Sequence, residues 1–164
     1  MGARIPVTII DNDAEMIDVA AQFGAKVYYG DGTRLDLLKQ AGGYEARAII
    51  FAMDQDQLSR EELELALKTF RQAAVYVRAY DRRALMRYRG LDTAAVIREV
   101  FESAVVMGRK TLKALGVDDE MIGKIETAYR ARDKERLRIQ AEKGTFSEEA
   151  RSISLSAPLL DDDQ

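Results

Sequence analysis

The chain has 164 residues, of which 47% are hydrophobic, and its 25 Lys and Arg against 28 Asp and Glu give a net charge of −3. This balance is typical of a globular protein about one domain long and excludes a mainly disordered or collagen-like chain. Because the chain has no Cys and no His, it cannot contain a disulfide, a thiolate zinc site or a Ser-His-Asp catalytic triad. The slight negative charge gives no general attraction to phosphates, so we predict no nucleic-acid partner.

The N-terminus carries no sign of export or membrane insertion. Residues 1–6 lack the apolar run of a secretory signal. No stretch of the sequence reaches the roughly 18 to 20 apolar residues that span a bilayer. We therefore expect a cytoplasmic setting.

The first hundred residues alternate between strand and helix patterns. Residues 7–10 are apolar and mostly β-branched without polar alternation, which is typical of a strand covered on both faces of a parallel sheet. Residues 14–23 then have apolar side chains at helical spacing, with Asp13 as the expected N-cap and Gly24 as the expected stop.

The same alternation continues along the chain. After a strand at 26–29 the pattern predicts, in order, a helix at 34–41, a buried strand at 48–53, a helix at 58–70, a strand at 75–79, a helix at 82–89 and a strand at 94–97. Strands separated by helices imply right-handed crossovers and a doubly wound parallel sheet of α/β class.

From residue 99 onward the pattern is helical. Residues 99–115 predict a long amphipathic helix, and residues 118–142 predict a second, highly charged one. The apolar positions of the first helix are Val100, Phe101, Ala104, Val105, Met107, Gly108, Leu112 and Leu115. This stripe is broader than one sheet face needs, which leaves two explanations, packing within the chain or a helix shared with a second subunit. Residues 143–164, with Pro158 and three consecutive Asp, predict a flexible acidic tail.

Short polar residues follow the first strand. Ligands of open parallel sheets bind beyond the carboxyl ends of the strands. An acidic residue at the position of Asp11 is what a dinucleotide fold uses to accept hydrogen bonds from both ribose hydroxyls. The alternative is a helix N-cap, a role that suits Asp13 better than Asp11.

The next two strand ends offer similar candidates. Gly30-Asp31-Gly32-Thr33 follows the second strand, where the glycines allow a flat ring to approach and Asp31 is placed to accept from an adenine amino group. An ordinary turn that caps the next helix is the alternative. Ala52-Met53-Asp54 follows the third strand, where a small residue lets a ligand lie over the sheet edge, or where Asp54 is a plain turn residue.

Arg78 differs from the neighbouring arginines because it lies at a strand end. There its guanidinium can bind a phosphate or a carboxylate with two parallel hydrogen bonds. The arginines of the following helix are interpreted as a solvated face. No pair of carboxylates has the arrangement of an acid and base, so we predict a binding or switching role without catalysis.

Four blocks of sequence together match a known family. They are residues 7–13, 27–38 (V-Y-Y-G-D-G-T-R-L-D-L-L), 77–82 (V-R-A-Y-D-R) and 98–104 (R-E-V-F-E-S-A). Over residues 5 to 135 the chain resembles the cytosolic RCK (KTN, TrkA-N) domain of Kef-type, glutathione-regulated potassium efflux systems.

This resemblance implies a Rossmann-like nucleotide-binding domain at residues 5–98 and a helical dimerisation extension at 99–142, followed by the tail at 143–164. It implies a homodimer attached to a membrane-embedded potassium:proton antiporter at the cytoplasmic face of the inner membrane. NAD(H) or AMP, and glutathione, are the implied ligands. Asp11 would hold ribose, Asp31 and Thr33 the adenosine end, and Arg78 an anionic group. The expected binding set is Asp11, Asn12, Asp31, Gly32, Thr33, Ala52, Met53, Asp54 and Arg78.

The chain departs from the family pattern in two places. Tyr80 stands where many relatives have a second arginine, which bears on glutathione specificity. The family's first strand and Gly-rich turn should precede Val7 and are absent, so we expect an N-terminally truncated sheet without its first βα unit, weakened nucleotide binding, and a Met1 that is a boundary or a misassigned start.

The absent strand is central in the usual order. We therefore predict that strands 7–10 and 48–53 pair directly, that another chain supplies a strand between them, or that the sheet rearranges through dimerisation. An NAD-dependent oxidoreductase fragment and a structural dimerisation module without ligand are the alternative functions.

Overall fold

The computed structural model describes residues 5–22, 24–54 and 57–143, and for residues 20, 21 and 143 it describes the backbone alone. Of the tail predicted at 143–164, residues 144–164 lie outside this range, as does residue 23, the predicted last residue of the first helix; Lys143 is the last residue of a helix. The chain divides into two compact units with the boundary between Glu99 and Val100. Along the described chain, no helix combines the length and apolar composition needed to cross a bilayer.

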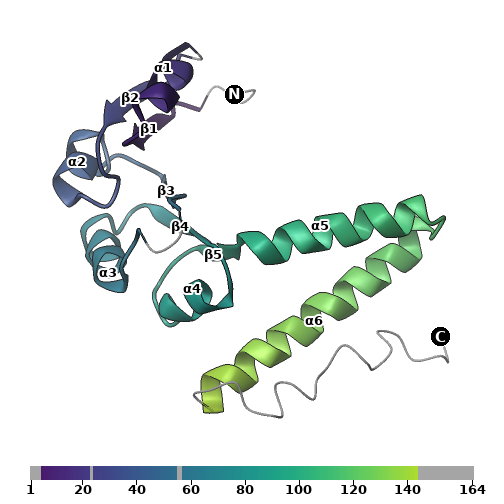
Figure 1. The fold of residues 1–164 in the computed structure, drawn as a ribbon. Coiled ribbons are helices and arrows are strands. Elements are labelled where there is room, and N and C mark those ends of the chain that lie inside the picture. The colour runs from purple at the N-terminus through teal and green to yellow at the C-terminus, as the bar shows by residue number, and fades with distance from the viewer. Residues whose placement is uncertain (1–4, 23, 55–56, 144–164) are drawn as a thin grey trace. The chain divides into compact units, whose positions relative to one another are not determined.

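The first unit alternates strands and helices as the sequence predicts (Figure 1). Its elements are β1 (Thr8–Asp11), α1 (Ala14–Gln22), β2 (Lys26–Tyr29), α2 (Leu35–Gln40), β3 (Ala48–Phe51), α3 (Arg60–Thr69), β4 (Ala74–Ala79), α4 (Arg82–Arg87) and β5 (Ala95–Arg98). The α/β class and the parallel pairing of the strands are confirmed.

The five strands form two sheets rather than one. β1 pairs with β2, and β3, β4 and β5 form a separate three-stranded sheet in that order. The prediction that the strands at 7–10 and 48–53 pair directly is wrong for the described residues, because β1 has only β2 as a partner and β3 has only β4. Among the described residues, β1 and β3 therefore each have one edge that is not hydrogen-bonded to a neighbouring strand.

The core lies on one face of the three-stranded sheet. In β3 and β4 every second side chain is buried, and these side chains belong to one cluster with residues of α2 and α3 and with Tyr88, which follows α4. The core cluster consists of Leu38, Ile49, Phe51, Leu58, Leu63, Ala66, Phe70, Val75, Val77 and Tyr88. This cluster fixes the carboxyl ends of β3 and β4 relative to α3 and α4, the elements that surround the cavity described below.

The prediction of a buried strand over residues 48–53 needs two corrections. The strand ends at Phe51, because its ladder with β4 ends at the Phe51 and Val77 pair. It is also covered on one face only, since Ile50 is 69% exposed while Phe51 is 3% exposed. A run of apolar residues does not reveal which face neighbouring helices cover, so sequence alone assigned both faces to the interior.

Local capping explains where the helices begin. Asp13 accepts hydrogen bonds from the Glu15 and Met16 amides at 2.9 and 3.5 Å, so its predicted role at α1 is confirmed. Asp81 caps α4 by accepting from the Arg83 and Ala84 amides. Such side chains satisfy amides that have no partner inside the helix.

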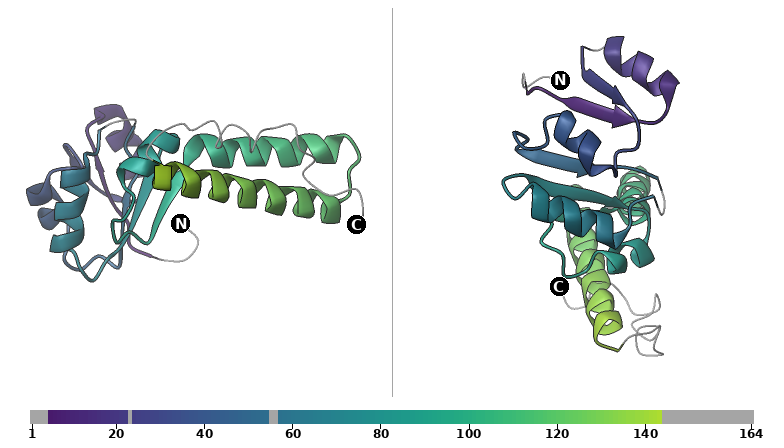
Figure 2. Two further views of the ribbon diagram at one scale, coloured as in Figure 1. Left: turned by 90° about the horizontal axis from the view of Figure 1, so that it is seen from below. Right: turned by 90° about the vertical axis from the view of Figure 1, so that its left-hand side faces the viewer.

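The second unit is an antiparallel helical hairpin, formed by α5 (Glu99–Ala114), which begins at the last residue of the first unit, and α6 (Asp119–Lys143) (Figure 2, left). Phe101 stacks on Tyr129 with ring centroids 5.5 Å apart. Arg130 forms two hydrogen bonds to Glu102, at 2.8 and 2.7 Å. This pairing holds the pKa of Arg130 above its usual range.

Within the hairpin, some apolar side chains of α5 are buried and others are exposed. Val105 is buried, and Phe101 and Leu112 are half-buried. Met107 and Leu115 remain 66% and 75% exposed. Packing within the chain therefore accounts for one side of the stripe and leaves the other side uncovered.

Candidate functional site

Two clusters of polar side chains lie at the carboxyl ends of the strands. We call four residues at the ends of β1 and β2 the Asp11 cluster: Asp11, the last residue of β1, with Asn12, Asp31 and Thr33. We call three residues at the ends of β3, β4 and β5 the Arg78 cluster: Asp54 after β3, Arg78 near the end of β4, and Glu99 after β5. The two sheets thus divide the predicted site residues between them.

The Asp11 carboxylate is held by its own turn. Its Oδ1 accepts a hydrogen bond from the Asp13 amide at 2.9 Å, while its carbonyl accepts from the Gly30 amide at 2.9 Å. Asn12 is exposed beside it. A carboxylate has about four acceptor positions, so this turn orients Asp11 and leaves acceptor capacity for a ligand hydroxyl.

The loop after β2 is a tight turn. Asp31 Oδ1 accepts from the Thr33 amide at 2.8 Å, and Gly30 has a φ of +150°. A Cβ at Gly30 would lie 2.7 Å from Leu37 Cδ2, so a larger residue would displace the end of the Leu37 side chain, and the backbone conformation is what favours glycine here. Gly32 is half-buried in the same turn. Residues 30–33 therefore form the turn that the sequence analysis gave as the alternative to a ligand site. This turn provides no side-chain cap for α2.

The start of α3 meets this loop. Glu62 Oε2 accepts from the Ser59 amide at 2.8 Å and from the Ser59 hydroxyl at 2.7 Å, and the Ser59 hydroxyl in turn accepts from the Glu62 amide. These bonds, with a further one from the Thr33 side chain, hold the pKa of Glu62 below its usual value. The Thr33 side chain therefore lies near the start of α3.

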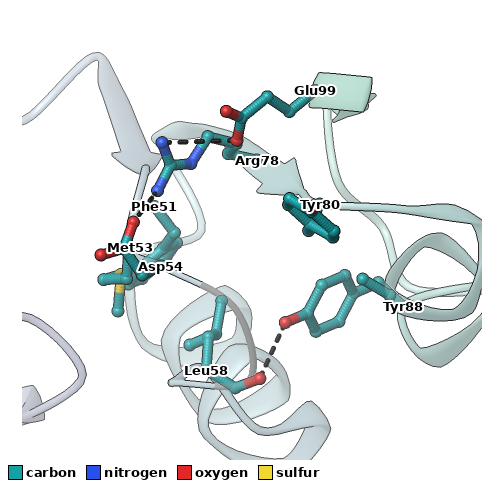
Figure 3. Close-up of a pocket in the computed structure, with 9 residues that line it drawn as sticks. Phe51, Met53, Asp54, Leu58, Arg78, Tyr80, Tyr88 and Glu99 are labelled. Atoms are coloured by element: carbon teal, nitrogen blue, oxygen red, sulfur yellow. Dashed lines mark hydrogen bonds and ion pairs between the residues drawn. The ribbon is translucent and has the colours of Figure 1, made fainter. Parts of the chain in front are cut away.

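The Arg78 cluster is built from three strand ends. The Arg78 guanidinium donates to Asp54 Oδ1 at 2.7 Å and lies 3.5 Å from Glu99 Oε2 (Figure 3). The side chains of Arg78, Asp54 and Glu99 are 35%, 87% and 46% exposed. One cation therefore lies between two carboxylates at the surface of the molecule.

A cavity of about 300 Å³ opens beside this cluster. Its lining residues are Phe51, Met53, Asp54, Leu58, Arg78, Tyr80, Ala84, Tyr88 and Glu99. Tyr80 and Tyr88 lie across the cavity from the guanidinium (Figure 3). The cavity thus combines one charged side with a largely apolar and aromatic remainder.

Long-range hydrogen bonds hold the cavity wall in place. The Tyr88 hydroxyl donates to the Leu58 carbonyl at 2.7 Å. Arg60 donates to the carbonyls of Arg87 and Arg89 at 2.7 and 3.0 Å, which ties the start of α3 to the end of α4. The cavity wall is therefore preformed by contacts that need no ligand.

The structure brings together three of the residues predicted from sequence, Met53, Asp54 and Arg78. Ala52 is exposed and does not line the cavity, and neither does any residue of the Asp11 cluster.

Sequence reasoning missed six lining residues as ligand-site candidates, namely Phe51, Leu58, Tyr80, Ala84, Tyr88 and Glu99. Two signals could have indicated members of this set: Glu99 comes immediately after β5, and Tyr80 stands where many relatives of the family have a second arginine. Along the described chain, no three acidic side chains are grouped to hold a metal ion.

Parallel strands that alternate with helices place this unit in the class of Rossmann-like α/β domains. The TrkA-N domain family model matches residues 1–99, and the chain belongs to this family. The resemblance drawn from the four sequence blocks is thereby confirmed.

Solved and curated relatives agree with this assignment. The solved structure described as "Shewanella denitrificans Kef CTD in AMP bound form" is 30% identical, covers 86% of each chain and has a TM-score of 0.70. A glutathione-regulated potassium-efflux system protein of Haemophilus influenzae is 36% identical over 156 residues, 95% of this chain and 25% of that protein. The KefC protein of Salmonella arizonae is 36% identical over 131 residues, 80% of this chain and 20% of that protein. The chain therefore spans a quarter or less of these curated relatives.

Proposed function

We propose that this chain is a regulatory domain that senses ligands and gates a potassium:proton antiporter of the Kef type. The main support for this proposal is the similarity to a Kef C-terminal domain described as AMP-bound, which is 30% identical over 86% of both chains. In this proposal the domain acts at the cytoplasmic face of the inner membrane, attached to or partnered by the transporter. It binds ligands without transforming them.

The Asp11 cluster is the proposed nucleotide site. Asp11 is oriented by its turn and keeps acceptor capacity for ribose hydroxyls. Asp31 and Thr33 follow the neighbouring strand, where the adenosine end would lie. The Asp13 side chain already accepts hydrogen bonds from the first amides of α1, so these amides are not available to a phosphate. We therefore expect AMP or NADH to bind mainly through the nucleoside.

Calorimetric titration with AMP, NADH and ATP tests this site. Asp11→Asn keeps an acceptor for the Asp13 amide and removes only the charge, so we expect AMP affinity to fall about tenfold, the loss of one charged hydrogen bond. Asp18→Asn, on the exposed side of α1, is the matched control and should leave AMP affinity unchanged. An equal affinity in both variants, or no nucleotide binding at all, would contradict the assignment. Turnover of NADH would instead support an oxidoreductase.

We propose further that the domain forms a homodimer through the uncovered side of α5. Val100 and Met107 in that helix, and Leu115 directly after it, are 47%, 66% and 75% exposed. An exposed apolar stripe on an amphipathic helix favours association with a like surface. Residues 99–142 are then the dimerisation extension of the 5–98 domain.

Sedimentation of the chain over a range of concentrations tests the dimer. Met107→Asp should raise the dimer dissociation constant at least tenfold, because a carboxylate would be placed within an apolar interface. Thr127→Asp, on the exposed side of α6, introduces the same charge away from the stripe and should have no effect. A monomeric parent chain would refute the homodimer.

A further inference from the structure

One face of the three-stranded sheet lacks cover among the described residues. Ile50, Tyr76 and Ile97 are 69%, 37% and 50% exposed. Ile50 pairs with Tyr76, and Ile97 pairs with Arg78, the next residue of β4 on the same side as Tyr76, so the three apolar side chains share one face. Sheets of parallel strands normally carry packed elements on both faces. This face therefore lacks the cover that the core face receives.

The uncovered face is apolar and has room for aliphatic side chains. Its remaining positions in the three strands are the alanines Ala48, Ala74 and Ala95. Along the paired residues of β3, β4 and β5 it has no carboxylate, and its one charged side chain, Arg78, lies near the carboxyl end of β4. Because apolar surface favours apolar contacts in water, the occupant should be an uncharged, aliphatic segment.

The chain contains a segment of this kind after α6. Residues 152–160 read S-I-S-L-S-A-P-L-L and have no charge, in a chain whose residues are 32% charged. The large aliphatic side chains of this segment are Ile153, Leu155, Leu159 and Leu160. Three aspartates follow at 161–163. The composition of the segment thus matches the uncovered face, and its acidic end meets no carboxylate there.

The tail is long enough to make this contact. The stacking of Phe101 on Tyr129 shows that α6 returns to the beginning of α5, which directly follows β5. From Lys143 to Leu160 the extended chain spans up to about 56 Å. A domain of about 100 residues has a radius of gyration of only about 13 Å. The length of the tail therefore permits the contact for any orientation of the two units.

We propose that residues 153–160 of this chain bind across the uncovered sheet face, with their aliphatic side chains against Ile50, Tyr76 and Ile97. A tail on the same chain has an effective local concentration in the millimolar range, so a weak contact suffices to keep it bound most of the time. The bound tail excludes other apolar partners from this face. This inference is independent of the ligand-sensing proposal and goes beyond it.

Alkylation of an introduced cysteine tests the contact in the full chain. The chain has no Cys, so Ala48→Cys places a single thiol on the uncovered face without removing its large side chains. A bound tail shields this thiol. Leu155→Asp combined with Leu159→Asp should release the tail, because carboxylates are costly to bury against apolar surface. We expect the alkylation rate to rise about tenfold in that background, the change for a tail bound about nine-tenths of the time.

Two controls separate the tail contact from general effects of charge. Thr145→Asp combined with Ser147→Asp adds the same two charges to the tail outside the proposed segment and should leave the alkylation rate unchanged. A single thiol introduced by Thr127→Cys, on the exposed side of α6, should react equally fast with and without the leucine substitutions. Ala95→Cys, on the same face of the sheet in β5, repeats the measurement should Ala48→Cys disturb the fold.

Two results would overturn the inference. One is an equal alkylation rate at position 48 and at position 95 in the parent and in the Leu155→Asp and Leu159→Asp background, in chains whose circular dichroism shows them folded. The other is protection that persists in that background and increases with protein concentration, which would assign the face to a second copy of the chain. Protection that depends on the leucines and is the same at all protein concentrations is the result expected for the chain's own tail.

Discussion

The two strand-end clusters come from the same sequence pattern, an aspartate at or shortly after the end of a strand, and yet they differ in what holds that aspartate. Asp11 and Asp31 accept hydrogen bonds from amides two residues further along the chain. Asp54 instead pairs with Arg78, 24 residues away. The comparison shows that a local turn motif predicts the first arrangement, while the second depends on how β3 and β4 align.

The clusters also differ in the packing beneath them. Val77, next to Arg78 in β4, is 2% exposed and belongs to the core. Val27, in the two-stranded sheet, is half-buried. The strand beneath the Arg78 cavity is therefore packed into the core, whereas the strand beneath the Asp11 cluster is only partly buried.

The largest expected effect follows from this difference in packing. Val77→Ala should lower the free energy of unfolding by about 2 to 3 kcal/mol, since it removes buried apolar surface and leaves a cavity. Val27→Ala is the same chemical change at a half-buried site and should cost less than about 1 kcal/mol. Urea denaturation measures both values, and equal losses would remove the distinction between the two sheets.

The second prediction concerns the loop of the Asp11 cluster. Gly30→Ala should cost about 1 to 3 kcal/mol, because the backbone conformation is unfavourable for alanine and the added Cβ would meet Leu37 Cδ2 at 2.7 Å. Gly32→Ala is the matched control, since its nearest neighbour is Ile10 Cγ2 at 4.0 Å. If both variants unfold at the same urea concentration, the backbone conformation at Gly30 does not determine the stability of this loop.

These contrasts indicate what sequence can and cannot predict. The strands, the α1 cap at Asp13 and the turn at Gly30 depend on contacts within a few residues, so their signals are present in the sequence. The cavity joins Leu58, Tyr80 and Tyr88 from different elements. No spacing between neighbouring residues predicts that grouping. Tyr88 in particular is buried, and its hydroxyl donates a hydrogen bond to the carbonyl of Leu58, 30 residues away.

The third prediction addresses the capping box at the start of α3. Ser59→Ala removes the hydroxyl that accepts from the Glu62 amide and should lower the free energy of unfolding by about 1 kcal/mol. Ser59→Thr keeps a hydroxyl at the N-cap and should recover most of the loss. Thermal unfolding of the two variants side by side provides the measurement, and an equally unstable threonine variant would argue against the cap.

The smallest expected effect is a pH dependence at the same contact. The pKa of Glu62 is lowered in the folded chain, first by the Ser59 amide, from a usual value of 4.5. A carboxyl with a lowered pKa contributes stability that is complete above the unfolded value and is lost as the pH falls through the folded value. Unfolding free energies of the parent chain and of Glu62→Gln, measured from about pH 6 to about pH 3, should therefore converge as the pH falls. Glu61→Gln, an exposed change in the same turn, shows the effect of losing a carboxylate without these bonds. A difference between the parent and Glu62→Gln that stays constant over this range would mean that the negative charge of Glu62 does not contribute to the stability of the α3 cap, which would then depend on the hydrogen bonds alone.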